Sequence, residues 1–155
     1  MVNIHLRAAS IQDLAILLEF EQNVIAAERP FNDAIKLTPT SYYDLNELIQ
    51  DDKSNLLVVE SKGDIIGSGY AQIRSSKISL KHEQHAYLGF MYVDSQHRGL
   101  GINKLIMDSL IQWSKAQGIT DLYLDVYEGN DAAIRAYEKV GFSKSLVEMK
   151  LSLNN

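Results

Sequence analysis

The sequence predicts an α/β domain of mixed (α+β) character, in which strand patterns and helix patterns follow one another along 155 residues. The first observation is periodicity, since short apolar runs alternate with stretches whose apolar residues recur every three or four positions. The second is composition, because 46% hydrophobic and 23% charged residues are the balance of a globular chain. We find no internal repeat and no linker-like tract, so we expect a single domain over residues 1–155.

A strand and a helix are the first predicted elements. Apolar and polar residues alternate over residues 4–8, which is the pattern of a half-buried strand. Ser10 then offers a capping hydroxyl, and Asp13 follows three residues later as the acidic partner of a helix cap. Apolar residues continue at helical spacing as far as Ile25, so the first helix is expected over this stretch.

A loop and a second helix are expected next. Both prolines, Pro30 and Pro39, fall within residues 27–40, so this stretch is predicted to be irregular. We expect a short helix to begin at Ser41, with Asp44 as the acidic partner of its cap.

The middle of the chain predicts three strands. Residues 56–59 form an apolar run, residues 62–64 supply turn chemistry, and residues 65–73 return as the partner strand of a hairpin. Residues 86–93 carry bulky side chains on both faces, as expected of a central strand that is covered on both sides.

The last third predicts two helices and further strands. A helix is expected over residues 101–117, a fifth strand over 122–126, a helix over 132–140, and a final strand or strands over 142–153. The core side of the first of these helices is predicted to carry Ile102, Leu105 and Leu110. A ligand crevice is expected where the strands of this section end.

Charge and composition limit the partners. Lys and Arg number 15 against 20 Asp and Glu, so the formal net charge is −5. We expect neither nucleic acid nor a membrane as the main partner, because both reward a basic face. There are no cysteines, which excludes disulfides and a thiolate metal site, and we expect no metal. Residues 1–10 lack the pattern of a secretory signal, so the expected location is cytoplasmic.

A basic, glycine-containing loop joins the predicted central strand to the helix that follows it. Free backbone amides at a helix start, helped by the helix dipole, form a site for anions. Gly99 and Gly101 let the main chain approach a phosphate closely, while Arg98 and Lys104 add positive charge. The loop therefore predicts a diphosphate-binding turn.

Three classes of ligand use such a turn. A dinucleotide fold needs a third glycine where Lys104 stands, and its turn follows the first strand instead of the fourth. A Walker-type loop needs four residues between its glycines followed by Lys and Ser or Thr, which this segment lacks. The third class is coenzyme A.

For coenzyme A, the segment resembles the first signature of the GCN5-related N-acetyltransferase (GNAT) family, a strand ending in Val followed by Arg/Gln-x-x-Gly-x-Gly/Ala. Read from Gln96, the pattern is complete, with Gly99 and Gly101 at the two small positions. Read from Arg98, it has the usual spacing from Val93 but departs from the signature at Asn103, which replaces the second small residue. We prefer the register from Arg98. Residues 126–142 resemble the second signature, roughly Val-x-x-x-Asn-x-x-Ala-x-x-x-Tyr-Glu-Lys-x-Gly-Phe, at every named position.

The resemblance implies a central sheet of six to seven strands, mixed but mostly antiparallel, flanked by about four helices, with a cofactor wedge between the fourth and fifth strands. It also implies an N-acetyltransferase that moves the acetyl group of acetyl-CoA onto a primary amine of a small molecule, an amino acid or a peptide. The amine attacks directly, so no protein nucleophile is needed. The alternative is a non-catalytic module that binds acyl-CoA as a sensor or regulator.

The resemblance further implies site residues. The backbone of Met91, Tyr92 and Val93 is expected to pair with the pantetheine arm, and Asn130 to contact the end of that arm while it caps the last helix. Tyr137 is expected to donate a proton to the leaving thiolate, although core packing is the alternative role. The expected diphosphate-binding residues form one run: Arg98, Gly99, Leu100, Gly101, Ile102, Asn103 and Lys104.

The general base is left open by the residues. Glu28 in the proline-bearing loop, His85 before the central strand, and Glu83 are the candidates, and a chain of water molecules is equally consistent. Tyr42 and Tyr43 are expected either to line an acceptor pocket or to pack the second helix. A homodimer is also considered, because symmetric pairs are common.

Overall fold

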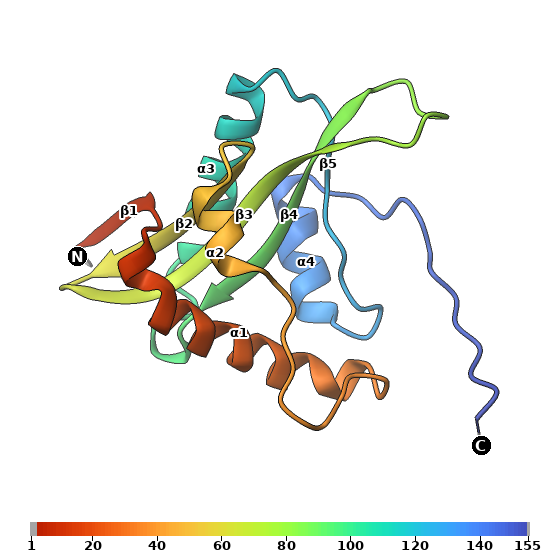
Figure 1. Cartoon of the computed structure of the whole chain (residues 1–155), viewed down its shortest axis with the longest axis horizontal. Coiled ribbons are helices and arrows are strands. Elements are labelled where there is room, and N and C mark those ends of the chain that lie inside the picture. The colour runs from red at the N-terminus through yellow and green to blue at the C-terminus, as the bar shows by residue number, and fades with distance from the viewer. Residues whose placement is uncertain (1–2, 155) are drawn as a thin grey trace.

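The computed structural model describes residues 3–154, and in this part of the chain five strands form one sheet (Figure 1). Four of them lie side by side in chain order, each antiparallel to the next: β1 (Ile4–Ala8), β2 (Ser54–Ser61), β3 (Asp64–Ser75) and β4 (Gln84–Val93). β5 (Leu122–Tyr123) pairs with β4 in the parallel direction. The sheet is therefore mixed and mostly antiparallel, as predicted.

Four α-helices cover the two faces of this sheet in the described part of the chain (Figure 1). α1 (Leu14–Glu28) and α2 (Leu45–Gln50) pack on one face. α3 (Ile102–Ala116) and α4 (Asp131–Val140) lie on the other. Single 3₁₀ turns adjoin α1 at Ile11–Asp13 and Arg29–Phe31, and a third, Ser95–His97, follows β4. Among residues 3–154, no helix is both long and apolar enough to cross a bilayer.

The alternation of side chains along the strands divides the core into two layers. Leu57 and Val59 of β2 belong to the layer beneath α3, whereas Leu56 and Val58 belong to the layer beneath α1 and α2. Because successive side chains of a strand point to opposite faces, a strand covered on both faces is apolar at every position. This explains the uninterrupted apolar run from which the strand was predicted.

The predicted hairpin and the predicted first helix start are confirmed. Lys62 and Gly63 have φ values of 53° and 84°, the left-handed conformation that a two-residue turn between β2 and β3 requires. The Asp13 carboxylate accepts a hydrogen bond from the Ser10 amide at 2.8 Å, as the predicted cap implies.

Two helix boundaries differ from the prediction. α1 runs through to Glu28, which is therefore the last residue of a helix and not part of the proline-bearing loop. Pro30 follows in the 3₁₀ turn, where its fixed φ is tolerated. α2 begins at Leu45 and not at Ser41, because the Asp44 carboxylate itself caps the helix by accepting an amide of the first turn at 3.0 Å.

The predicted final strand is wrong for the described residues. Residues 142–154 follow α4 as an extended segment that leaves the body of the molecule (Figure 1) and pairs with none of the five strands. A strand forms only with a ladder of backbone hydrogen bonds to a neighbour, and β5 itself is only two residues long. The sheet of residues 3–154 therefore has five strands and not the expected six to seven.

The buried side of α3 provides a stability test. Leu110 is fully buried, whereas Leu105, which was predicted on the same side, is 42% exposed. Leu110→Ala is expected to lower the free energy of unfolding by about 2–5 kcal/mol, because it removes buried methyl groups and leaves a cavity. The matched change Leu105→Ala is expected to cost about 0.5 kcal/mol or less. Urea denaturation measures both losses, and equal losses would contradict this assignment of the buried side.

Candidate functional site

β4 and β5 separate shortly after they pair. Their register covers only two pairs, Ala86 with Leu122 and Tyr87 with Tyr123. Beyond Tyr87, β4 continues to Val93 with no described strand beside it on this side. The backbone groups on that edge of β4 are not used by the sheet, so a ligand with amide groups can pair with them as a strand would.

A β-bulge changes the direction of the β4 backbone at the same place. The pairing of β3 with β4 shifts register between Ser68 and Tyr70, and Phe90 has a φ of 56°, which is rare for a bulky residue. The Phe90 ring is buried against Tyr43, with centroids 4.9 Å apart. The Phe90 carbonyl accepts a hydrogen bond from the buried Ser68 hydroxyl at 3.1 Å. Buried contacts thus hold an unfavourable backbone conformation, as is common beside active sites.

The loop after β4 leads into the amino end of α3. Gly99 and Gly101 both have a φ of 80°, and a Cβ added at either would meet nothing within 4 Å, so the loop is open on its outer side. The first intrahelical bond of α3 runs from the Leu105 amide to the Gly101 carbonyl at 3.1 Å. The amides before Leu105 therefore have no helical acceptor, and they form an anion site at the helix start.

Arg98 and Lys104 are placed differently around this anion site. Arg98 is exposed, and its Nε donates to the Val93 carbonyl at 3.1 Å, which ties the loop to the end of β4. Lys104 forms an ion pair with Asp108 one turn further along α3, at 2.6 Å. Both partners are at least half exposed, and exposed ion pairs of this kind are weak. The Lys104 ammonium is therefore free to exchange its partner for an anion.

Asn130 and Tyr137 stand on α4, across the wedge from β4. Asn130 caps α4, since its Oδ1 accepts the amide of Ala133 at 3.3 Å. Tyr137 packs against the core beneath α3 and meets Phe142 edge-on, with ring centroids 6.3 Å apart. Burial raises the pKa of Tyr137, and the negative charge of Glu28 raises it further. Tyr137 therefore packs in the core, and the Glu28 carboxylate also influences the pKa of its hydroxyl.

Glu28 gathers with two tyrosines at the carboxyl end of α1. Burial raises the pKa of Glu28, and the neighbouring Tyr42 hydroxyl partly offsets the rise. The Tyr42 hydroxyl is buried and makes no hydrogen bond of ordinary geometry to the described residues. Its pKa is raised by burial first, then by Glu28 and by Tyr127. A buried hydroxyl without a partner is uncommon, and this one lies where a bound polar group can supply the missing bond.

The turn after α1 contacts the segment before α4. The Asn32 side-chain amide donates to the Tyr127 hydroxyl at 2.9 Å, and Phe31 stacks on Tyr127 with centroids 6.3 Å apart. A Cβ added at Gly129 would come within 3.3 Å of the Phe31 ring. These contacts connect the turn that follows Glu28 to the segment that leads into α4.

The other two base candidates lie elsewhere. His85 is six residues before Met91 on β4, which is about 20 Å along an extended strand. Its Nδ1 lies 2.9 Å from the Ser76 hydroxyl oxygen, and burial together with the neighbouring His82 lowers the pKa of His85. Glu83 is exposed in the loop before β4. Of the three base candidates, Glu28 is the one whose charge acts on the pKa of the acid candidate Tyr137.

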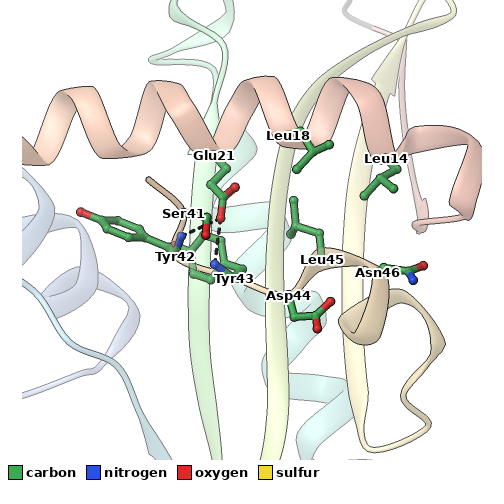
Figure 2. Close-up of a pocket in the computed structure, with 9 residues that line it drawn as sticks. All are labelled: Leu14, Leu18, Glu21, Ser41, Tyr42, Tyr43, Asp44, Leu45 and Asn46. Atoms are coloured by element: carbon green, nitrogen blue, oxygen red, sulfur yellow. Dashed lines mark hydrogen bonds between the residues drawn. The ribbon is translucent and has the colours of Figure 1, made fainter. Parts of the chain in front are cut away.

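A groove of about 540 Å³ lies between α1 and the segment that leads into α2 (Figure 2). The Glu21 carboxylate is almost fully buried and accepts the amides of Tyr42 and Tyr43 at 2.9 and 2.8 Å. In Figure 2 the Tyr42 ring points out of the groove, while Tyr43 packs in the core beneath α1. Glu21 therefore positions the tyrosine that lies beside Glu28.

Several residues of this region escape prediction from sequence. Tyr127 and Asn32 are 95 positions apart, and no periodicity links them. The only signal for Glu21 is a charge on the apolar side of the predicted first helix, next to Leu17 and Phe20. Both Tyr42 and Glu28 were candidates on sequence grounds, but their proximity was not predictable.

The chemistry of this site follows from its three parts. A free strand edge, a bulge beside it and an open anion site at a helix start suit a ligand with an amide-bearing arm and a diphosphate. Coenzyme A has both. The fold and the site therefore define an α/β protein of the class that binds acyl-CoA between two diverging strands.

The chain belongs to the acetyltransferase (GNAT) family, whose family model matches residues 21–142. The matched range contains the wedge, the anion site and α4. The family resemblance drawn from the two sequence signatures is therefore confirmed.

Individual relatives cover the chain to different extents. The probable N-acetyltransferase family 8 member 5 of Mus musculus is 28% identical over 123 residues, which is 78% of this chain and 53% of that protein. N-acetyltransferase 8 of Rattus norvegicus is 33% identical over 98 residues, 63% of this chain and 43% of that protein. The chain thus spans about half the length of these relatives.

Solved structures share the fold along nearly the whole chain. A mutant of the BH1408 protein from Bacillus halodurans superposes with a TM-score of 0.85 at 24% identity, covering 96% of this chain and 99% of that chain. A predicted acetyltransferase with acetyl-CoA from Clostridium acetobutylicum superposes with a TM-score of 0.75 at 18% identity, covering 97% of each chain. At this level of identity, the likeness shows a common fold.

The raised pKa of Glu28 gives a pH-dependent stability test. Its contribution to stability is fully present below the unfolded-state pKa of about 4.3, and it is lost as the pH rises through the higher folded-state pKa. Glu28→Gln removes the ionisation. The free energy of unfolding of this variant relative to the parent is therefore expected to increase between pH 4 and pH 7.

Denaturant titrations at both pH values measure this difference. Glu19→Gln, on an exposed position of the same helix, is the control and is expected to show no comparable trend. A relative stability of Glu28→Gln that stays constant with pH would mean that the carboxylate is not desolvated in the folded protein.

Proposed function

We propose that the chain is an acetyl-CoA-dependent N-acetyltransferase that acetylates a primary amine of a small molecule, an amino acid or a peptide. The observation that supports this most directly is the unpaired edge of β4 beside the open anion site at the start of α3, in a chain of the GNAT family. Glu28 and Tyr137 are the candidates for the proton transfers. Burial raises the pKa of both groups, and the charge of Glu28 acts on Tyr137. Two titratable groups perturbed in one cleft are candidates for a base and an acid.

The donor side follows from the free edge of β4 and the start of α3. The backbone of Met91, Tyr92 and Val93 would pair with the pantetheine arm, and a bulge amide would stabilise charge on the carbonyl oxygen. The amides of the anion site, together with Arg98, would hold the diphosphate. Asn130 would contact the end of the arm. Acetyl-CoA supplies an activated thioester in this position.

The proton transfers are assigned to Glu28 and Tyr137. A primary amine with a pKa of about 10.4 is almost entirely protonated at neutral pH, so a base is needed before it attacks. Burial moves the pKa of Glu28 toward neutrality, which suits it to accept that proton directly or through a water molecule. Burial also keeps the Tyr137 hydroxyl protonated until it donates to the leaving thiolate.

The acceptor side suits a cationic group. The Glu28 carboxylate lies beside Tyr42, which in turn neighbours Tyr127, and a carboxylate and aromatic rings both attract an ammonium ion. The unpartnered Tyr42 hydroxyl offers a further hydrogen bond to the acceptor. These features support an amine as the acceptor. The loops around the site would contact the rest of the acceptor molecule.

The donor assignment predicts a selective effect of Gly101→Ala. The φ of 80° at Gly101 is costly for alanine, so the loop is expected to move its amides away from the diphosphate. The Kd for acetyl-CoA, measured by calorimetry, is expected to rise about tenfold, which corresponds to about 1.4 kcal/mol. Gly63→Ala, with a φ of 84° and equally open surroundings in the β2–β3 turn, is the matched control. An equal rise in both variants would contradict the assignment.

The catalytic assignment is tested by thiol release from acetyl-CoA. The chain has no cysteine, so every thiol detected comes from the cofactor. The acceptor panel would include polyamines, aminoglycosides, free amino acids and peptides with free amino termini. Tyr137→Phe and Glu28→Gln are each expected to lower kcat by roughly 10²–10⁴-fold, with little change in acetyl-CoA affinity.

His85→Asn is the control, because His85 lies near the other end of β4, and it is expected to retain the activity of the parent. A kcat of Tyr137→Phe equal to that of the parent at every pH would exclude the acid role. If the parent binds acetyl-CoA but releases no thiol with any acceptor, the alternative function as a non-catalytic acyl-CoA sensor would be favoured instead.

A further inference from the structure

The segment after α4 exposes a row of apolar side chains. Residues 143–153 are extended and leave the body of the molecule (Figure 1). The large apolar residues here are almost fully exposed: Leu146 84%, Val147 74%, Met149 90%, Leu151 84% and Leu153 88%. We call residues 143–153 the tail.

The tail has the pattern of a strand that lacks its neighbours. Val147, Met149 and Leu151 alternate with polar residues, so one face of the extended tail is apolar. Its only described ion pair with the body joins Lys150 to Asp33 at 3.8 Å, and both side chains are exposed, so this contact is weak. A free apolar strand of this length is a template for pairing with another strand.

The same chain carries a matching unpaired edge at β5. Within residues 3–154, β5 pairs only with β4, so its other edge has no strand. The apolar surface around this edge is incompletely covered, because Leu122, Leu124 and Phe142 are half-buried and Val126 is 36% exposed. α4 beside it is amphipathic and has no fully buried residue.

We propose that the tail of one copy of this chain pairs with the β5 edge of a second copy, and that the exchange is reciprocal. Each copy supplies one exposed apolar strand and one open edge at β5, so a two-fold pair uses both in each copy. In Figure 1 the tail runs away from the body of its own chain, so it does not lie along its own β5.

The charges of the two segments are complementary. The tail carries Lys144 and Lys150 with one acidic residue, whereas the β5 edge and the loop after it carry Asp121, Asp125 and Glu128. Opposite charges across a strand pair stabilise it.

The exchange also affects the candidate site. The added strand would cover the outer side of β5 and the apolar side of α4, the helix that carries Tyr137. β5 and α4, which form the side of the wedge opposite β4, would then pack against residues of both copies. The anion site at the start of α3 would still be formed by one copy alone.

Light scattering and crosslinking of the 155-residue chain test the proposal. The mass in solution is expected to be twice the chain mass of 17.4 kDa. Because the chain has no cysteine, an engineered pair reports one contact alone. Val126→Cys combined with Met149→Cys, treated with a short bismaleimide, is expected to give a covalent dimer on a denaturing gel.

The control pair combines Met149→Cys with Ile78→Cys, which is fully exposed in the loop between β3 and β4. It is expected to give no covalent dimer. A monomeric mass for the parent overturns the proposal, and so does a Val126–Met149 crosslink that leaves the gel mass at one chain, because the tail would then fold back on its own β5. A dimeric mass without this crosslink overturns it as well.

A double change in the tail provides an independent readout. Met149→Asp with Leu151→Asp removes the apolar face of the tail and is expected to halve the mass in solution. Circular dichroism would check that the variant is folded. If it does not fold, the crosslinking result decides, and a folded variant that remains dimeric overturns the proposal.

Discussion

The separation of β4 from β5 is the constraint on which the rest of the site depends. A strand paired along the whole of β4 would consume its backbone groups, but the pairing ends after Tyr87 and the bulge at Phe90 changes the backbone direction just beyond. The left-handed conformation of Phe90 is unfavourable in isolation. It persists because the ring is buried against Tyr43 and the carbonyl is held by Ser68. The core beneath α1 and α2 thus maintains the opening beside the free edge of β4.

The acceptor end of the wedge combines a buried carboxylate with several tyrosines, which is a costly arrangement for folding alone. Desolvation raises the pKa of Glu28, and the Tyr42 hydroxyl lacks a partner. Both costs are reduced when a cationic or hydrogen-bonding ligand arrives, so they are consistent with a site that binds and reacts. Glu21 keeps Tyr42 in place by accepting two amides of its segment. Glu21 of α1 therefore positions Tyr42, the tyrosine that lies beside Glu28 of the same helix.

The β5 end of the sheet is the least covered part of the fold. β5 has two residues and α4 has no fully buried residue, whereas β2, β3 and β4 have eight to twelve residues each. The extended apolar tail follows α4 in the chain. Asn130 and Tyr137 belong to the same end, so the proposed exchange and the proposed cofactor site would share these elements.

The sequence by itself determined the family and the order of elements up to the last helix, because these depend on local patterns: apolar periodicity, glycine spacing and two signatures. It was also sufficient to name Glu28, His85 and Tyr137 as candidates, but not to choose between the two bases. The tertiary structure separates them, because the charge of Glu28 acts on the pKa of Tyr137, whereas His85 lies toward the other end of β4. These positions are set by packing and not by sequence spacing. The tail shows the same limit. Its alternation predicted a strand, but a strand also needs a neighbour, and the described fold of one chain leaves the tail without one.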